Sequence, residues 1–229
     1  MSLISYPSGE TSFRARIIAH RGFWLEASEK NSLSAFVRAL THGFGIETDV
    51  RDLDGELVIS HDPPRSRDKP MSFSTFLEIY KSIGTDGWLA LNIKSDGLSN
   101  LVDDFLKKHE IENAFVFDMS VPDMRHYMNS KMNVFTRMSD IEPIACCVEQ
   151  CAGVWLDSFD EPYTKSSVID KIAAEGRLAA IVSPELHKRN HLDAWSDWAS
   201  SFNLSENGRL MLCTDFPSKA LEYFGDKND

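Results

Sequence analysis

Short apolar runs alternate with longer segments of helical periodicity along the whole chain. The runs at 16–22 (RIIAHRG), 45–53 (GIETDVRDL) and 88–94 (WLALNIK) are short, apolar and rich in Ile, Val and Leu, which is typical of buried strands. Asp54-Gly55 is a tight-turn signal after the second run, and 56–60 (ELVIS) is predicted to return as its hairpin partner.

Amphipathic segments separate these runs and are predicted to form helices. Segment 32–43 has Ser32 at a capping position and ends in a terminating glycine. Segment 73–84 follows the hairpin, and segment 98–111 places apolar residues on one face. The residues predicted on that face are Leu98, Leu101, Val102 and Phe105.

The same alternation continues to the carboxyl terminus. Further strands are predicted at 114–119, 133–139, 152–158, 177–186 and 208–215, and helical segments at 121–130, 166–176 and 194–202. Eight parallel-type strands in a chain of 229 residues predict an α/β fold, a compact (β/α)₈ TIM barrel. We expect residues 1–229 to form a single domain without a sizeable inserted cap. A doubly wound open sheet is the alternative, although no glycine-rich turn follows the first strand.

Charge and hydropathy exclude several functional classes. The chain has 24 Lys and Arg against 35 Asp and Glu, a formal charge of −11, and no cluster of basic residues. Such a surface repels nucleic acids and anionic membranes. No segment approaches the ~18 apolar residues of a membrane span, and residues 1–20 lack the basic start and apolar run of a secretory signal.

The cysteines favour a reducing compartment. They are crowded into one region plus one distant position, unlike a secreted disulfide framework, and lack the spacing of a zinc site. We interpret them as reduced, buried structural thiols of a cytoplasmic protein. They are Cys146, Cys147, Cys151 and Cys213. A tryptophan-rich stripe in segment 194–202 (Trp195, Trp198, Phe202) is interpreted as a core face rather than a membrane or ligand surface.

A barrel gathers its chemistry at the carboxyl ends of its strands. Almost every predicted strand of this chain ends in a strongly polar or charged side chain, so these ends define the candidate site. The residues are His20, Arg21, Glu47, Asp49, His61, Asn92, Lys94, Arg137, Asp157, Glu185, Thr214 and Asp215.

Glu47 and Asp49 are the candidate metal ligands. Residues two apart in a strand share a face, so both carboxylates are predicted to point into the barrel mouth. Hard oxygen ligands suit Mg²⁺, Ca²⁺ or Mn²⁺, and two close carboxylates are costly without a cation. The alternative is a solvated or salt-bridged pair of carboxylates at a strand end.

Asn92 and Lys94 share a face in the same way. Asn92 can offer an amide oxygen to the same cation, and Lys94 can meet an anionic group or form an internal ion pair with Glu47 or Asp49. His20 and His61 reach the same rim from different strands. A histidine on each side of a bound group can accept a proton on one face and donate one on the other.

Several sequence blocks resemble a known family. They are AHRG at 19–22, EKNSLSAF at 29–36, GIETDVRDLDGELVISHD at 45–62 and TDFP at 214–217. In this order and at these separations they resemble the signature of the glycerophosphodiester phosphodiesterases, relatives of the phosphatidylinositol-specific phospholipases C. The resemblance is dense over the first third of the chain and looser at the last strand.

The resemblance implies a TIM barrel that cleaves a phosphodiester into an alcohol and a phosphomonoester. By motif position, His20 and His61 would be the acid/base pair, and Arg21 would hold phosphate oxygens. Glu47 and Asp49 would bind a divalent cation. These implied roles agree with those argued from the residues themselves.

The chain departs from the family pattern at three places. Asn92 stands where the family usually has an acidic ligand, which should weaken cation binding. Only residues 62–72 lie between the hairpin and the next helix, where many members carry a small insertion, so a more open mouth is expected. Lys30 replaces the acid that usually precedes Asn31.

We therefore expect a metal-dependent phosphodiester hydrolase acting on a glycerophosphodiester or a similar small polyol or sugar phosphodiester. Arg21, Lys94, Arg137 and Asp157 are the candidate substrate-binding residues, although Arg137, Asp157 and Glu185 could equally serve only in ion pairs. The alternative is a catalytically weak barrel that binds phosphorylated polyols or a protein partner. A metal-using aldolase is a third possibility, but no Schiff-base or enolate-stabilising arrangement is evident.

Overall fold

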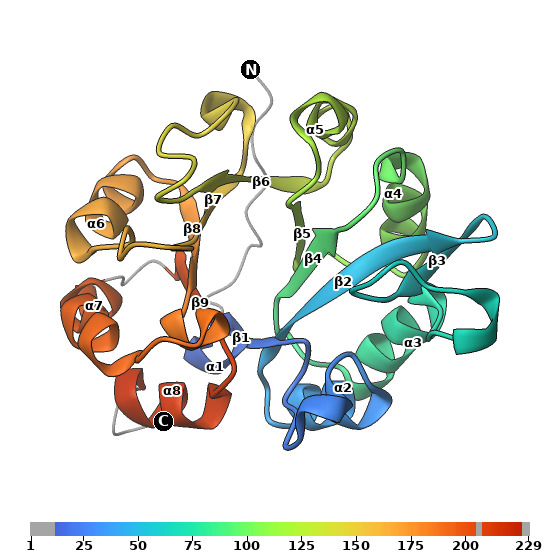
Figure 1. The fold of residues 1–229 in the computed structure, drawn as a ribbon, viewed down its shortest axis with the longest axis horizontal. Coiled ribbons are helices and arrows are strands. Elements are labelled where there is room, and N and C mark those ends of the chain that lie inside the picture. The colour runs from blue at the N-terminus through green and yellow to red at the C-terminus, as the bar shows by residue number, and fades with distance from the viewer. Residues whose placement is uncertain (1–11, 205–207, 226–229) are drawn as a thin grey trace.

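The computed structural model describes residues 12–204 and 208–225 and shows the predicted (β/α)₈ barrel, without an inserted domain (Figure 1). Parallel pairing runs from strand to strand around the sheet, and β1 pairs with both β9 and β2, which closes the ring. The parallel strands are β1 (Ile17–His20), β2 (Gly45–Leu53), β4 (Leu89–Ile93), β5 (Ala114–Phe117), β6 (Asn133–Met138), β7 (Gly153–Leu156), β8 (Leu178–Val182) and β9 (Leu210–Thr214).

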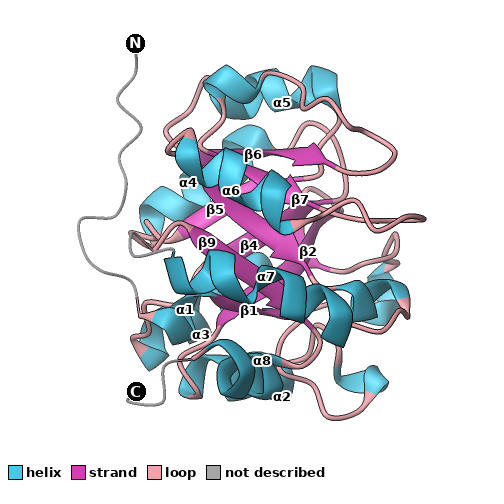
Figure 2. Cartoon of the chain, turned by 90° about the vertical axis from the view of Figure 1, so that its left-hand side faces the viewer, coloured by secondary structure: helices cyan, strands magenta, loops and turns pink. Residues whose placement is uncertain are grey.

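Helices form the outer layer of the barrel (Figures 1 and 2). Serine caps begin several of them: Ser32, Ser72 and Ser120 each accept a hydrogen bond from the backbone amide three residues later. The β6–β7 connection contains only a 3₁₀ turn, Val148–Gln150. The helices are α1 (Phe13–Arg16), α2 (Leu33–Thr41), α3 (Phe73–Ile83), α4 (Ser99–Lys108), α5 (Val121–Met128), α6 (Ser166–Ala174), α7 (Leu192–Leu204) and α8 (Pro217–Phe224).

A hairpin extends the sheet beyond the barrel wall. β3 (Glu56–Ile59) pairs antiparallel with the second half of β2, as predicted, and Val50 is the register partner of Ile59. Asp54 and Gly55 both have positive φ angles, 53° and 88°, which is the left-handed conformation that this two-residue turn requires. The hairpin brings the segment after β3 back to the middle of β2.

Aromatic side chains fill the barrel interior. Phe117 stacks on Trp155 with ring centroids 3.9 Å apart, and Phe115 stacks on Phe135 at the same separation. All of these rings are at least 96% buried, so the barrel is a packed core rather than a channel. The polar positions beyond these rings therefore lie above a closed floor.

The second core lies between the sheet and the helices. Trp195, Trp198 and Phe202 are buried in it, which confirms the interpretation of the tryptophan stripe as a core face. The prediction for α4 is wrong at Leu101, whose exposed fraction is 39%, because Leu106 packs inward in its place.

The cysteine prediction is correct only in part. None of the four is in a disulfide, and Cys151 and Cys213 are buried. Cys146 and Cys147 are half-buried, because they lie in the β6–β7 loop, and their Sγ atoms are 3.4 Å apart. Among residues 12–204 and 208–225, no helix has the length and apolar character needed to cross a membrane.

Candidate active site at the carboxyl ends of the strands

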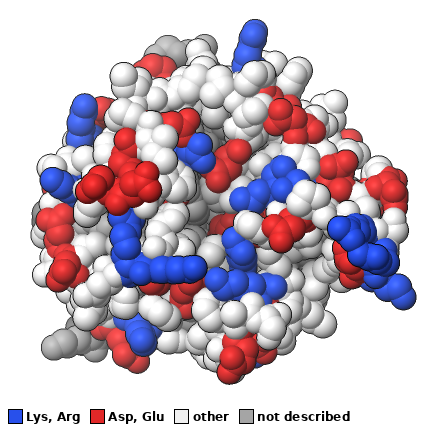
Figure 3. All heavy atoms as spheres, viewed as in Figure 1, with Lys and Arg blue, Asp and Glu red and all other residues white. Residues whose placement is uncertain are grey.

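The parallel strands of the barrel all run toward one end, at the right in Figure 2 and facing the viewer in Figure 1. Register places polar side chains side by side there: His20 pairs with Glu47, and Asp49 pairs with Asn92. Because Ile18 and Ala90 belong to the interior core, the alternation of strand side chains directs His20 and Asn92 inward as well. Figure 3 shows Lys, Arg, Asp and Glu side chains around a central hollow at this face.

His20 is held by a carboxylate from the last strand. Its Nδ1 atom lies 2.7 Å from Oδ1 of Asp215, the residue that follows β9. An ionised carboxylate only accepts hydrogen bonds, so Nδ1 carries the proton and Nε2 is left free. Nε2 lies 3.9 Å from Oε2 of Glu47. Burial lowers the pKa of His20 despite the opposing effect of Asp215, so the imidazole is neutral near pH 7.

Glu47 and Asp49 form the buried acidic pair that the sequence predicts. Their exposed fractions are 1% and 0%. Burial first, and the neighbouring Asp49 charge second, raise the pKa of Glu47 to about 8. The backbone amide of Arg21 donates to Glu47 Oε2 at 3.2 Å. Without a further cation, the pair therefore favours a protonated Glu47 at neutral pH.

Two basic side chains lie against Asp49. Arg21 Nε is 3.2 Å from Oδ2 of Asp49, and Lys94 Nζ is 3.4 Å from Oδ1. The internal ion pair that the sequence left open for Lys94 is thus formed, and Arg21 takes part as well. The Nε–H of Arg21 makes no hydrogen bond of good geometry, so the guanidinium is near its partner without being saturated by it.

Asn31 also contacts Asp49, at the oxygen that faces Arg21. Its Nδ2 donates to Oδ2 of Asp49 at 2.9 Å, and its Oδ1 accepts from the Thr48 hydroxyl at 2.8 Å. The residue has a φ of 59°, the left-handed region that asparagine tolerates better than most residues. Asn31 therefore fixes the direction of the Asp49 carboxylate.

The oxygen atoms at the base of the mouth fit a hard cation. Oδ1 of Asn92 is buried and lacks a hydrogen-bond partner, Oδ1 of Asp49 is buried with only the ion pair to Lys94, and Glu47 adds a second carboxylate. Buried acceptors without partners are costly unless another ligand satisfies them. The described residues contain no group of three or more His, Cys, Asp and Glu suited to a metal, because the third candidate ligand here is an amide.

His61 lies at the rim and is more open than His20. The backbone amide of Ser60 donates to the carbonyl of Asp49 at 3.0 Å, which anchors the segment beside β2. The His61 side chain is 45% exposed, and its Nδ1 lies 2.9 Å from Oδ1 of Asp62. The structure shows no direct contact between His61 and His20.

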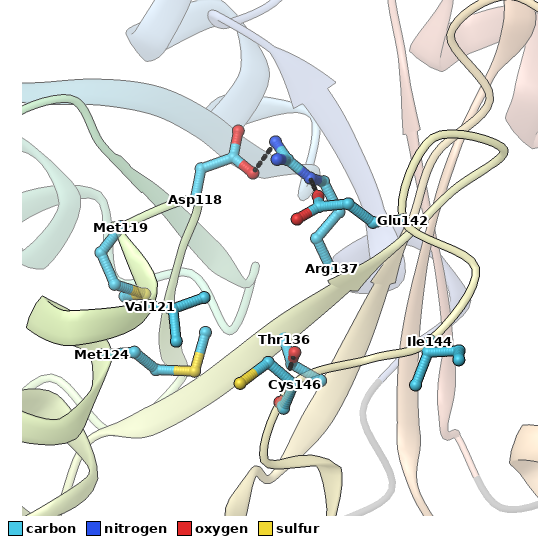
Figure 4. A pocket seen from close by; sticks show the side chains of 9 residues that line it. All are labelled: Asp118, Met119, Val121, Met124, Thr136, Arg137, Glu142, Ile144 and Cys146. Carbon is cyan, nitrogen blue, oxygen red and sulfur yellow. Dashed lines mark hydrogen bonds and ion pairs between the residues drawn. The ribbon is translucent and has the colours of Figure 1, made fainter.

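Arg137 and Asp157 lie at the same face but engage different partners. Arg137 forms ion pairs with Asp118, at 3.0 Å, and with Glu142 (Figure 4). Asp157 is bonded to Nε2 of His187 at 2.7 Å. Beside Arg137, a small cavity of about 60 Å³ is lined by Asp118, Met119, Val121, Met124, Thr136, Arg137, Glu142, Ile144 and Cys146.

Glu185 buttresses the last strand. Its carboxylate accepts hydrogen bonds from the Ser183 and Thr214 hydroxyls and, at 3.1 Å, from the backbone amide of Asp215. The residue therefore supports the position of Asp215 through neighbouring groups. These contacts are hydrogen bonds rather than the ion pairs that the sequence left open for Glu185.

The fold resembles several solved structures of phosphodiesterases. A proposed glycerophosphodiester phosphodiesterase from Galdieria sulphuraria has a TM-score of 0.73 at 16% identity, over 92% of this chain and 98% of that one. A phosphodiesterase from Oleispira antarctica, solved with its product sn-glycerol-3-phosphate, has a TM-score of 0.63 at 17% identity, over 92% and 97%. The glycerophosphodiester phosphodiesterase from Agrobacterium tumefaciens has a TM-score of 0.61 at 12% identity, over 91% and 98%.

The chain shares the fold of glycerophosphodiester phosphodiesterases. The fold-level similarity covers the whole barrel. The sequence itself matches no protein-family model and no curated protein. Any activity must therefore be argued from the side chains at the mouth.

Sequence reasoning placed Asp215 at a strand end but did not assign it a partner. The partner is His20. The sequence held a signal for this pair, because the TDFP block ends the last strand, and a closed barrel pairs the last strand with the first. Lys30, noted only as a departure, lies 3.8 Å from Oδ2 of Asp215 and packs over the Trp24 ring. Two histidine–carboxylate pairs thus line the mouth, His20–Asp215 from β1 and β9 and His187–Asp157 from the neighbouring β8 and β7.

Proposed function

We propose that this protein is a divalent-metal-dependent phosphodiester hydrolase acting on a glycerophosphodiester or a similar small polyol phosphodiester. The observation that carries the proposal is the half-buried His20–Asp215 pair, in which Nε2 of His20 lies beside the acidic pair of the second strand. The shared fold with phosphodiesterases supports it, one of them solved with sn-glycerol-3-phosphate.

His20 is suited to general acid–base work. Asp215 fixes the ring and its tautomer, so Nε2 presents a lone pair to the mouth. Because the pKa of His20 is lowered by burial, the imidazole is ready to accept a proton from an attacking water or substrate hydroxyl at neutral pH. The proton then rests at Nε2, and Asp215 stabilises the imidazolium that forms.

Arg21 and Lys94 would hold the phosphate. Both are partly exposed, at 23% and 22% of the side chain, while Asp49 beneath them is fully buried. A phosphate oxygen arriving from solvent can therefore meet both cations without displacing Asp49. Their fixed positive charges would favour the charge that develops on the nonbridging oxygens.

Glu47, Asp49 and Asn92 would hold the cation, Mg²⁺, Mn²⁺ or Ca²⁺. Buried carboxylate and amide oxygens are the ligands such ions prefer, and Oδ1 of Asp49 and Oδ1 of Asn92 make no hydrogen bond. When bound, such a cation polarises a phosphoryl oxygen as a Lewis acid. Its charge would also offset the repulsion between the two carboxylates, which adds to burial in raising the pKa of Glu47.

His61 would protonate the leaving alkoxide. Its half-exposed side chain lies on the hairpin segment anchored to Asp49, so it can approach a bound phosphodiester from the rim. Asp62 accepts from its Nδ1, so the imidazolium form, protonated at both nitrogens, would give its proton to the alkoxide from Nε2. Chemistry on the two faces of one phosphate would thus come from His20 at the base and His61 at the rim.

Release of sn-glycerol-3-phosphate from a glycerophosphodiester tests the proposal. The protein is treated with EDTA, and turnover is measured before and after Mg²⁺, Mn²⁺ or Ca²⁺ is restored. Loss on chelation and recovery with a cation support a metal-dependent hydrolase. Calorimetric binding of sn-glycerol-3-phosphate with no turnover under any cation would instead identify the catalytically weak binding barrel.

We also propose that residues 1–229 form one domain and that the protein works in the cytoplasm. The continuous ring of strands over the described residues supports the first statement. The four free thiols support a reducing compartment.

A further inference from the structure

A second group of side chains, here named the distal wall, lines the barrel mouth over strands β5 to β8 and adjoins the His20–Asp215 pair only at β8, which pairs with β9. It consists of Asp118, Arg137, Asp157, Phe159 and His187, which follow or end strands β5 to β8. Phe159 contacts two members of the group. The guanidinium carbon of Arg137 lies 5.5 Å from the Phe159 ring centroid, and the ring centroids of His187 and Phe159 are 5.2 Å apart.

The carboxylates of the distal wall already have partners. Arg137 forms an ion pair with Asp118, and Nε2 of His187 lies 2.7 Å from Oδ1 of Asp157, which accepts the hydrogen bond. The backbone amide of Ser158 donates to the same Asp157 oxygen at 2.7 Å. Cationic head groups therefore find no unpaired carboxylate in the wall. Phe159 is also occupied on its ring by two neighbours, so it offers no aromatic cage to a quaternary ammonium.

The distal wall still has hydrogen-bond donors and acceptors that its internal contacts do not use. With Nε2 of His187 held by Asp157, its Nδ1 stays available, and the side chain is 25% exposed. The second oxygen of Asp157 and the partly exposed Arg137 guanidinium add an acceptor and donors. Donors and acceptors around an aromatic ring are the chemistry that recognises a neutral polyhydroxyl group.

The wall is held in place by an independent contact. The carboxylate of Asp140 accepts the backbone amides of Phe159, Asp160 and Glu161 at 2.7, 2.7 and 2.9 Å. These bonds lower the pKa of Asp140 to about 2, against the effect of burial, so the carboxylate stays ionised. Asp140 is thus a positioning residue that fixes the Phe159 loop before any ligand arrives.

The distal wall and the phosphate-facing residues belong to one mouth. Burial raises the pKa of Asp118, and the charges of Arg137 and Lys94 act in the opposite direction. Lys94, the residue that follows β4, is therefore within electrostatic reach of the wall. A phosphodiester whose phosphate meets Arg21 and Lys94 would direct one of its two alcohol groups toward β5 to β8.

We propose that the distal wall binds the alcohol group of the substrate and selects a neutral, cyclic polyol, such as a hexose or an inositol, over choline or ethanolamine. This inference rests on the proposed phosphodiesterase function and deepens it. Arg137 and Asp157 would then contact the substrate, and His187 and Phe159 join them as residues that set specificity.

Turnover of three probes tests the proposal: glycerophosphoinositol, glycerophosphocholine and glycerophosphoethanolamine. The expected kcat/KM for the inositol ester exceeds the other two by about tenfold or more, because loss of a hydrogen bond to a buried polar partner costs at least that factor. His187→Ala and Asp157→Asn should raise KM for the inositol ester about tenfold while leaving kcat, and the choline ester, within about twofold.

Matched variants separate recognition from folding. His126→Ala, on the exposed face of α5, and Asp104→Asn, on the exposed face of α4, should leave all three substrates unaffected. Asp140→Ala should reproduce the KM effect of His187→Ala, since it releases the Phe159 loop. A wild-type preference for the choline ester, or an equal loss on all three esters, would overturn the proposal.

Binding distinguishes failure of this inference from failure of the proposed function. If no ester is hydrolysed, the phosphodiesterase proposal fails, and calorimetry with myo-inositol 1-phosphate and phosphocholine still tests the wall. Tighter binding of the inositol phosphate, lost in His187→Ala, would support the distal wall. Equal binding of both ligands would contradict it.

Discussion

His20 and Asp215 are separated by 195 residues in the sequence, yet Nδ1 of the first lies 2.7 Å from Oδ1 of the second. Closure of the ring by β1 and β9 brings them together. The geometry leaves Nε2 of His20 free beside Glu47, and it makes Asp215 responsible for the tautomer of the ring.

Asp215→Asn should lower kcat by about 10²- to 10⁴-fold while leaving the fold intact. Asparagine can present its amide to Nδ1 and so permits the wrong tautomer. Because Asp215 raises the pKa of His20, its removal should also move the acid limb of the kcat/KM profile to lower pH. Asp104→Asn is the control. If Asp215→Asn kept full activity and the acid limb of its kcat/KM profile did not move, Asp215 would not act on His20.

The wild-type acid limb itself should lie below the ordinary histidine pKa of 6.5, because burial lowers the pKa of His20. Activity should therefore persist to a lower pH than a solvent-exposed imidazole would allow. The measurement is kcat/KM against pH with a cation present at saturation. An acid limb above 6.5 would contradict the burial argument.

Glu47 should make the metal-free protein less stable as pH rises. Its folded pKa of about 8 is above its unfolded value of 4.5, so the folded state binds the extra proton between these values. The associated stability is fully present below pH 4.5 and is lost as pH rises through about 8. The free energy of unfolding is measured in urea and EDTA as a function of pH. Relative to wild type, Glu47→Gln should become more stable as pH rises across this window. A constant difference between the two proteins at every pH would refute the shift.

Asn92→Asp should tighten divalent-cation binding by about tenfold, since affinity at oxygen sites rises with the number of charged ligands. The side chain keeps its shape and its place next to Asp49 in the register. Calorimetry with Mg²⁺, Mn²⁺ and Ca²⁺ measures the change. If an inert wild type gained turnover through this substitution, the amide would be identified as a lost ligand and the catalytically weak barrel would be favoured.

Gly22→Ala should destabilise the fold much more than Gly55→Ala. Both glycines have positive φ, 86° and 88°, so both substitutions carry a similar backbone penalty of about 1 kcal/mol. A Cβ at Gly22 would lie 2.8 Å from the Ala35 side chain and 2.9 Å from its backbone, whereas nothing lies within 4 Å at Gly55. The expected loss at Gly22 is about 3 kcal/mol of unfolding free energy, and equal losses would rule out the close approach.

The barrel could be predicted from sequence because its signals are local. Strand 45–53 agrees with the structure at both ends, and Ser32 and Ser72 cap the helices that follow the strands. Two-residue alternation also placed Glu47 and Asp49 on one face. Leu101 was misplaced because a helical stripe identifies a buried face without locating its edges.

Pairings across the mouth could not be predicted in the same way. His187 lies 30 residues after Asp157, at the end of the 3₁₀ turn Pro184–His187, and no periodic pattern in the sequence predicts that turn. Whether Lys94 meets Asp49 or a ligand depends on side-chain reach and on burial, which spacing does not encode. Strand order thus follows from local patterns, while the partner of each titratable group follows from the closed three-dimensional ring.

The rate of sn-glycerol-3-phosphate release from a glycerophosphodiester, compared between wild type, His20→Ala and His61→Ala with a divalent cation present, is the most direct test of the proposed chemistry. His126→Ala serves as the matched histidine control. We predict cation-dependent turnover in wild type and His126→Ala and its loss, by about 10²-fold or more, in both other variants. Undiminished turnover in His20→Ala and His61→Ala would contradict the acid–base assignment.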